Sequence, residues 1–194
     1  RWTLPNDHEI PTTLGITCSN ITFLGEGKHT TTILGGFAIR DFENITFKQM
    51  TLTNTSDGGS GIRMRDAKVE LFDVALTGCV FCALCLTNVT SETTIVATRC
   101  EFTNSSYGAL VEGSLTSCTF KNCVFNDNSS SGILLSGSTI HLHGDATAIH
   151  SNEDVGVDAF HSSKVIIHLP SNHNTFYNNE GRDRGTFSGG TITN

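Results

Sequence analysis

Apolar and polar residues alternate along short segments of this chain, in a pattern that recurs about every 25 residues. Such alternation is typical of strands with one buried face, and the 3.6-residue period of an amphipathic helix is absent. The clearest segments follow one another by one repeat: Phe47-x2-Met50-x-Leu52, Leu71-x2-Val74-x-Leu76, Ala97-x2-Cys100-x-Phe102 and Phe120-x2-Cys123-x-Phe125. The pattern therefore predicts short strands at a fixed place in every repeat.

A second set of strand-like segments follows the same period. Each opens with a small residue, and the openings lie at Gly36, Gly61, Cys82, Gly108, Gly132, Gly156 and Gly185. A period of about 25 residues with several short strands and no helix is typical of a solenoid. We therefore predict an all-β fold, a parallel β-helix of about seven coils, in which like residues stack one coil apart at about 4.8 Å.

A chain of 194 residues is expected to form one domain with a continuous core. We predict an N-terminal cap and first coil over residues 1–20 and stacked coils over residues 21–194. The last coil reaches Thr191–Asn194 without a polar cap. We therefore expect the segment to belong to a longer natural chain.

Several segments resemble a known superfamily. Residues 9–14, 20–27 and 32–36 are similar to the first coils of pectin-lyase-like right-handed β-helix proteins, and Phe102-Thr103-Asn104 is similar to the repeats of polymorphic outer-membrane adhesins. The resemblance covers nearly the whole chain and implies a right-handed solenoid. It leaves function open, because the superfamily includes lyases, hydrolases, epimerases, phage tailspikes and adhesins.

The composition narrows the possible partners and the location. Charged residues are only 16% of the chain and the net charge is −7 without a basic run, so we expect no nucleic-acid partner. No apolar stretch approaches the roughly 20 residues that span a bilayer. The polar composition and six glycosylation sequons favour an extracellular, cell-surface or virion-surface setting. The glycosylation candidates are Asn20, Asn44, Asn88 and Asn128, whereas Asn54 and Asn104 also suit a turn position.

One strand face is predicted to point outward and to carry an apolar ridge. Alternation from Ile62 and Met64 through Ala83 and Cys85 gives the inward set. The outward set then holds Arg63, Arg65, Leu84, Leu86, Leu110 and Leu134. Stacked leucines on a surface favour a protein partner or self-association, and the alternative is a loop of the same chain that covers them.

Seven cysteines cannot all pair with one another. The spacing Cys79-x2-Cys82-x2-Cys85 is compatible with zinc, but the alternation with apolar residues favours buried thiols, so we predict no metal site. Cys100 and Cys123 lie one repeat apart at the same position and are the best disulfide candidates. No cofactor is predicted, and no residue set supports the calcium ion that some enzymes of the superfamily bind.

A single acid and base pair stands out. Asp158 falls on the outward face, and His161 follows three residues later. The carboxylate and histidine sets that polysaccharide-cleaving enzymes need are otherwise missing. We therefore predict a non-enzymatic extracellular module for adhesion, assembly or glycan binding. The alternative is a lyase or epimerase that acts on an acidic polysaccharide with Asp158 and His161.

Overall fold

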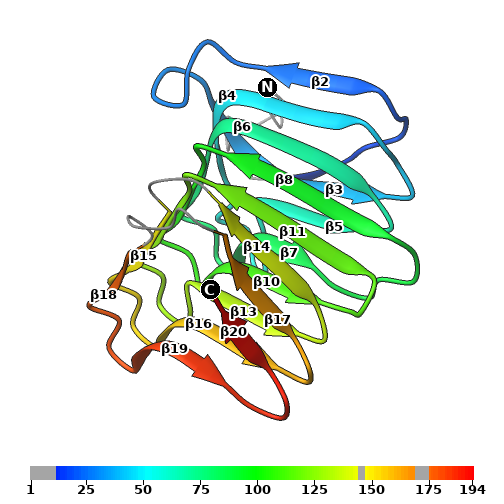
Figure 1. Cartoon of the computed structure of the whole chain (residues 1–194). Coiled ribbons are helices and arrows are strands. Elements are labelled where there is room, and N and C mark those ends of the chain that lie inside the picture. Colours follow the sequence, from blue (N-terminus) through cyan, green and yellow to red (C-terminus); the bar gives the residue numbers. More distant parts are fainter. Residues whose placement is uncertain (1–11, 144–146, 169–174) are drawn as a thin grey trace.

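A computed structural model describes residues 12–143, 147–168 and 175–194, which wind as a parallel β-solenoid of about seven turns with about 24 residues per turn (Figure 1). These described residues form twenty strands in one continuous parallel sheet and no helix. The predicted all-β solenoid and its number of coils are confirmed. Residues 1–11 of the predicted cap lie outside the described residues, and the rest of the cap contributes the first strand.

Three files of strands form the wall of the solenoid. In the first file each strand pairs with the equivalent strand one coil away. Its members are β1 (Thr12–Gly15), the second half of β3 (Thr32–Arg40), β5 (Ile62–Arg65), β7 (Cys82–Leu86), β10 (Tyr107–Glu112), β13 (Ile133–Ser136), β16 (Val155–Phe160) and β19 (Arg182–Thr186).

The second and third files follow along the chain. The second holds β2 (Ile21–Leu24), the first halves of β4 (Ile45–Thr53) and β6 (Lys68–Thr77), β8 (Thr93–Thr98), β11 (Thr116–Lys121), β14 (Thr139–His143), β17 (Lys164–Ile167) and β20 (Thr191–Thr193). The third holds the start of β3, the ends of β4 and β6, β9 (Glu101–Thr103), β12 (Val124–Asn126), β15 (Ala148–His150) and β18 (Thr175–Tyr177).

One residue in the left-handed region turns the chain from the second file to the third. In successive coils it is Gln49, Asp73, Arg99 or Asn122, with φ between 53° and 55°. Non-glycine residues adopt this conformation rarely. Its recurrence in four coils explains why the alternation of the repeat shifts after Phe47, Leu71 and their equivalents.

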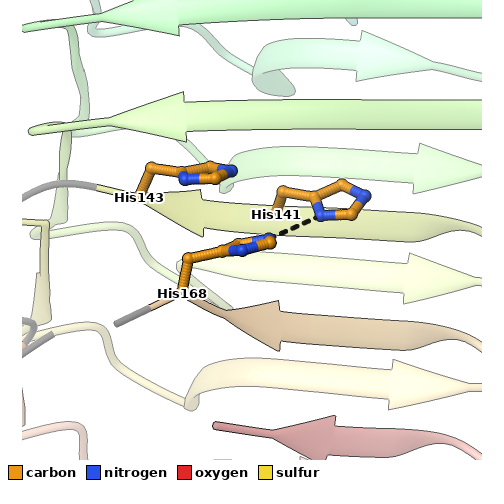
Figure 2. Close-up of side chains that lie close together, drawn as sticks. All are labelled: His141, His143 and His168. Carbon is orange, nitrogen blue, oxygen red and sulfur yellow. Dashed lines mark hydrogen bonds between the residues drawn. The ribbon is translucent and has the colours of Figure 1, made fainter. Parts of the chain in front are cut away.

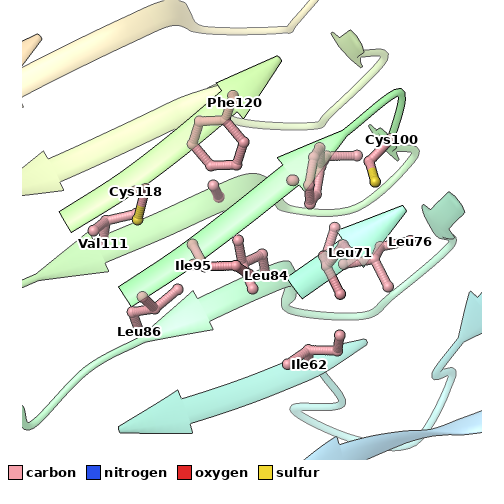
Figure 3. Packing of buried hydrophobic residues seen from close by; sticks show 14 of the residues in the cluster. Ile62, Leu71, Leu76, Leu84, Leu86, Ile95, Cys100, Val111, Cys118 and Phe120 are labelled. Atoms are coloured by element: carbon pink, nitrogen blue, oxygen red, sulfur yellow. The ribbon is translucent and has the colours of Figure 1, made fainter. Parts of the chain in front are cut away.

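The interior is filled by columns of like side chains, as the repeat predicts (Figure 3). Phe102 stacks on Phe125 at 4.6 Å between ring centroids, and Phe120 meets both rings edge-on. All three are fully buried. Burial of each such side chain contributes about 2–3 kcal/mol, so the core columns are the main source of stability.

A ladder of amides, buried at Asn128 and Asn152 and half-buried at Asn179, lines the corner between the third and first files. Asn128 Nδ2 donates to Asn152 Oδ1 at 2.9 Å, and Asn152 Nδ2 donates to Asn179 Oδ1 at 2.8 Å. Of the residues expected at this turn position, Asn54 is fully buried and its Nδ2 donates to the Ser60 carbonyl at 2.9 Å, whereas Asn104 and Asp127 stay outside the ladder. They adopt the left-handed φ of 50° and 54° but are exposed, and the following residue forms the ladder instead.

A seam of glycines faces this ladder. A methyl group on Gly132 would lie 2.7 Å from the carbonyl oxygen of Gly156 and 2.8 Å from Asn152 Nδ2. On Gly108 it would lie 2.4 Å from the Gly132 oxygen. Glycine recurs here because neighbouring coils approach too closely for a side chain.

No helix among the described residues has the length and apolar character that a transmembrane helix requires.

Candidate functional site

The outward face of the first file carries most of the residues that the sequence singled out. Cys85 pairs with Arg63 on one side and with Leu110 on the other. Leu110 pairs with Leu134, and Leu134 pairs with Asp158. These five residues form one outward column, in which the predicted places of Arg63, Leu110, Leu134 and Asp158 agree with the register.

Leu84 and Leu86 were predicted in this outward column, and the prediction is wrong. Both are fully buried in the core, and Figure 3 shows them among the side chains that fill the interior. The coil that leads from Ile62 to its partner Leu84 is shorter than its neighbours, so an alignment anchored on Cys82 is displaced by one position. Such a shift moves every side chain of a strand to the other face. Cys85 is therefore the outward residue.

The apolar ridge is shorter than predicted and is largely covered by its own chain. Leu110 is 8% exposed and packs with Cys82 and Cys85, while Phe81, just before β7, and Tyr107, at the start of β10, pack against the cluster. The alternative in which the same chain covers the leucines therefore fits this cluster. Association of a partner through Leu110 and Leu134 stays a prediction.

The two outward arginines differ in their surroundings. Arg63 is exposed in the outward column. Arg65 is half-buried, and its Nε lies 3.7 Å from Asp66 Oδ2. Asp66 is itself held by the backbone NH groups of Thr90 and Ser91 at 2.7 and 2.6 Å. Burial alone would raise the pKa of Asp66, but these hydrogen bonds outweigh it and lower the pKa to about 2.

Asp158 lies in the outward column but is only 6% exposed. Gly185 is its neighbour in the next coil, and a methyl group there would lie 2.5 Å from Asp158 Oδ1. This oxygen has no hydrogen-bond partner among the described residues. Burial raises the pKa of Asp158, and the nearby Arg182 guanidinium offsets part of the effect. The site thus holds a buried carboxyl group with one unpaired oxygen.

His161, the predicted partner of Asp158, contacts a neighbouring coil, and a catalytic role for the two residues stays a prediction. It is exposed in the corner after β16 with φ 49°, and its Nδ1 lies 3.0 Å from Ser136 Oγ. No hydrogen bond joins His161 to Asp158 within the described parts of the chain. The sequence placed the two residues close together but could not show that the left-handed corner directs the imidazole toward the neighbouring coil.

An aromatic patch lies at the end of β16 and β19. It consists of five residues: Phe160, Phe187, Arg182, Asp158 and His161. The rings of Phe160 and Phe187 stack with centroids 4.9 Å apart and planes 13° apart. Arg182 Cζ lies 4.6 Å from the centroid of the Phe187 ring, and Phe187 is 36% exposed. The patch therefore combines an open aromatic surface with one cation and one carboxyl group.

The predicted disulfide between Cys100 and Cys123 is absent, because both cysteines are free and buried. Cys100 Sγ donates to the Thr98 carbonyl at 3.4 Å, and Cys123 Sγ donates to the Lys121 carbonyl at 3.4 Å. The thiols are neighbours in one column, as the repeat predicts. Each thiol thus has a backbone carbonyl of its own coil as acceptor, and Cys123 Sγ also lies 3.5 Å from the Ala97 carbonyl of the neighbouring coil.

The cysteines of the Cys79-x2-Cys82-x2-Cys85 segment lie in two different environments. All three are buried and free, as the alternation with apolar residues predicted. Cys82 belongs with Cys85 to the outer apolar cluster, whereas Cys79 lies next to the amide ladder, its NH donating to Ser105 Oγ at 3.1 Å. Burial raises the pKa of the Cys79 thiol, which therefore stays protonated at neutral pH.

The glycosylation candidates divide by exposure. Asn20, Asn44 and Asn88 are exposed, and Asn44 Nδ2 donates to Asn20 Oδ1 at 2.9 Å. Their modification stays a prediction. Asn128 is a wrong candidate, because it is fully buried and its amide is part of the ladder.

A cluster of three histidines projects from the second file, on the outer side of the wall (Figure 2). His141 and His143 alternate with buried Leu142 on β14, and His168 follows β17 in the next coil. His141 Nδ1 lies 2.8 Å from His168 Nε2, and the rings of His143 and His168 stack at 3.8 Å. One nitrogen of each ring lies within 4.8 Å of the others.

The three imidazoles are half-buried, and the surroundings of His141 and His143 favour the neutral form of these two rings. Burial lowers the pKa of His141 and of His143, and the neighbouring His168 adds to both effects. Neutral imidazole nitrogens are ligands for divalent transition metals. Sequence analysis did not single out this cluster. The signal that could have found it was a His-x-His pair on a strand followed by a third histidine one coil later.

Comparison with protein families gives one match. A family model described as a right-handed β-helix region matches residues 60–193. Comparisons with curated proteins and with solved structures found no match.

Proposed function

Since the chain belongs to the right-handed β-helix family, we propose that it is a non-enzymatic extracellular or surface module that binds glycan at the aromatic patch on β16 and β19. The observation that carries the proposal is the stacked, partly exposed pair of Phe160 and Phe187, with the Arg182 guanidinium over the Phe187 ring.

The aromatic pair supplies the apolar part of such a site. An aromatic face carries negative charge density and packs well against the C–H groups of a sugar ring. Parallel pairing holds Phe160 at the end of β16, and the NH of Phe187, just after β19, donates to the Ala159 carbonyl at 2.9 Å, so both rings keep their places without a ligand. A preorganised surface loses little conformational entropy when a flexible polymer binds.

The polar residues of the patch supply direction. Arg182 can donate to a hydroxyl group or to a uronate carboxylate, and the buried Asp158 carboxyl group lies close enough to interact with its charge. A mostly apolar surface with a few fixed polar groups is the usual composition of a small-ligand site. Uronate oligosaccharides are the glycans for which Arg182 offers an additional ionic contact.

Calorimetric titration with oligomers of alginate and polygalacturonate tests the proposal. We expect Phe187→Ala to weaken binding by about 1 kcal/mol, roughly fivefold in Kd, because one of the two ring faces is removed. The matched control is Tyr177→Ala, since Tyr177 is also exposed and stacks on His150 at 4.6 Å in another file. No binding by the native chain, or equal losses for both variants, would contradict the proposal.

A second candidate function is uronate elimination or epimerisation, and one observation favours it. Burial raises the pKa of Asp158, as a carboxyl group that acts as a general acid requires. Assays of the same polymers for unsaturated products and for epimerised residues distinguish the two functions. Turnover by the native chain that Asp158→Ala abolishes would replace the binding module with an enzyme.

A further inference from the structure

We propose that His141, His143 and His168 form a binding site for one divalent transition-metal ion, for which zinc is the representative probe. The site lies on the second file and is independent of the aromatic patch on the first file. It uses three imidazole nitrogens from two adjacent coils and leaves at least one coordination position open to solvent.

The backbone brings these ligands together without strain. Residues two apart on a strand project from the same face, so His141 and His143 point outward together. The parallel register then places His168 one coil beyond His143, because the preceding residues Leu142 and Ile167 are partners. The sheet therefore fixes the spacing of His141 and His143 along β14 and the spacing of His143 and His168 between coils. Figure 2 shows all three rings on the same side of the strands.

The ring nitrogens lie close to the spacing that a metal requires. Zinc to nitrogen bonds of about 2.0–2.1 Å with tetrahedral angles place ligand nitrogens about 3.3 Å apart. One nitrogen from each ring is already within 4.8 Å of the other two. Rotation of the imidazoles about their side-chain torsions closes the remaining gap. The hydrogen bond between His141 and His168 is then replaced by two bonds to the ion.

The type and number of ligands specify the class of metal. Nitrogen-only ligands suit zinc, copper and nickel, whereas calcium and magnesium require several oxygens. Three histidines with an open position are a known ligand set for zinc. The half-buried rings leave an access path from solvent, and the chain's net charge of −7 favours the approach of a cation.

One neighbour opposes the ion. Lys121 precedes His143 in the same outward column. Its side chain is exposed, and the long flexible stem lets the ammonium group turn toward solvent. Water screens the repulsion between such exposed charges, so this effect is small beside three coordination bonds.

Calorimetric titration of the intact, EDTA-treated chain with zinc chloride tests the proposal. We expect one ion per chain, and no binding of calcium or magnesium at the same concentrations. His143→Gln and His168→Gln should each weaken zinc binding at least about tenfold, because loss of even an outer-shell partner costs that much. His29→Gln is the matched control, since His29 is exposed and lies outside the cluster.

Two further measurements keep the test decisive. Circular dichroism and urea unfolding without metal should show that both variants fold, and if one does not, the other carries the comparison. An X-ray absorption spectrum at the zinc edge should show three imidazole ligands. Absence of zinc binding at millimolar concentration, binding that both variants retain, or a spectrum with fewer than three imidazoles would overturn the proposal.

Discussion

Two stacks of like side chains, one inside the wall of the solenoid and one outside it, show how the same winding produces opposite results. Asn128, Asn152 and Asn179 stack in the interior at intervals of one coil. His143 and His168 stack on the exterior at the same interval. The repeat sets the spacing of both stacks. The side of the wall on which a stack lies determines whether core side chains or solvent surround it.

The difference lies in how many hydrogen-bonding groups remain available. In the interior, Asn152 Oδ1 accepts from Asn128 while Asn152 Nδ2 donates to Asn179 and to the Phe125 carbonyl. Every polar atom of that amide is used, as burial demands. On the exterior, His141 and His168 share one hydrogen bond, and their other nitrogens can face solvent or a ligand. An interior stack thus stabilises, whereas an exterior stack can bind.

The largest effect is expected where the interior ladder is cut. Asn152→Ala leaves the backbone NH of Asn128 without its acceptor and removes the amide donor to Asn179 Oδ1 and to the Phe125 carbonyl. Buried unsatisfied groups of this kind cost about 1–3 kcal/mol each, so we expect a loss of about 3 kcal/mol in the free energy of unfolding. Urea unfolding measures it.

The neighbouring exposed residue provides the control for this ladder variant. Glu153→Ala should change stability by less than about 0.5 kcal/mol, because it removes an exposed side chain from the same turn. A similar loss for Asn152→Ala and Glu153→Ala would mean that the amides do not stabilise the corner.

A smaller loss of stability, which depends on pH, is expected at Asp66, where a carboxylate rather than an amide connects two coils. The buried carboxylate of Asp66 accepts three hydrogen bonds from Thr90 and Ser91 in the next coil. Asp66→Asn should cost about 1–2 kcal/mol at pH 7, since bonds to a charged acceptor are the stronger ones. Urea unfolding at a series of pH values measures it.

The sign of the pH effect follows from the pKa. Folding lowers the pKa of Asp66 from 3.8 to about 2, so its contribution is complete above about pH 5 and is lost as the pH falls toward 2. The difference between the native chain and Asp66→Asn should shrink over that range. Asp57→Asn, at an exposed position, is the control, and a difference independent of pH would contradict the assignment.

The smallest effect is expected in the exterior stack. His143→Gln should change the metal-free stability by less than about 0.5 kcal/mol, because the ring is half-buried and only stacks on His168. Urea unfolding in EDTA measures it, with His29→Gln alongside. A loss as large as that of Asp66→Asn would make the histidines structural and would remove the contrast between the two stacks.

Much of the fold could be predicted from the sequence because the columns of interior side chains follow the sequence repeat. The columns of Phe47, Leu71, Ala97 and Phe120 align in the structure as they do in the repeat. The prediction failed at Leu84, where one short coil displaced the alignment. Alternation alone cannot reveal such a change, since apolar residues occupy both faces of β7.

The candidate sites were harder to predict because they depend on contacts between coils. Asp158 was placed correctly, but the orientation of His161 depends on a left-handed corner and on Ser136 in the previous coil. His168 joins His141 only through the register of β14 and β17. Residue spacing contained this information, but it could be used only once the length of every coil was known.

The glycine seam limits how a chain of this kind can lengthen by duplication of a coil. Since a methyl group would clash at Gly108 and Gly132, we expect a copied segment of this part of the chain to need its own glycine, and Ala83 holds the equivalent position only in the short coil. Duplication of the unit from Gly132 to Val155 meets this condition and would lengthen the rod by one step. Replacement of the seam glycine by a larger residue, by contrast, would prevent the added coil from packing on its neighbour.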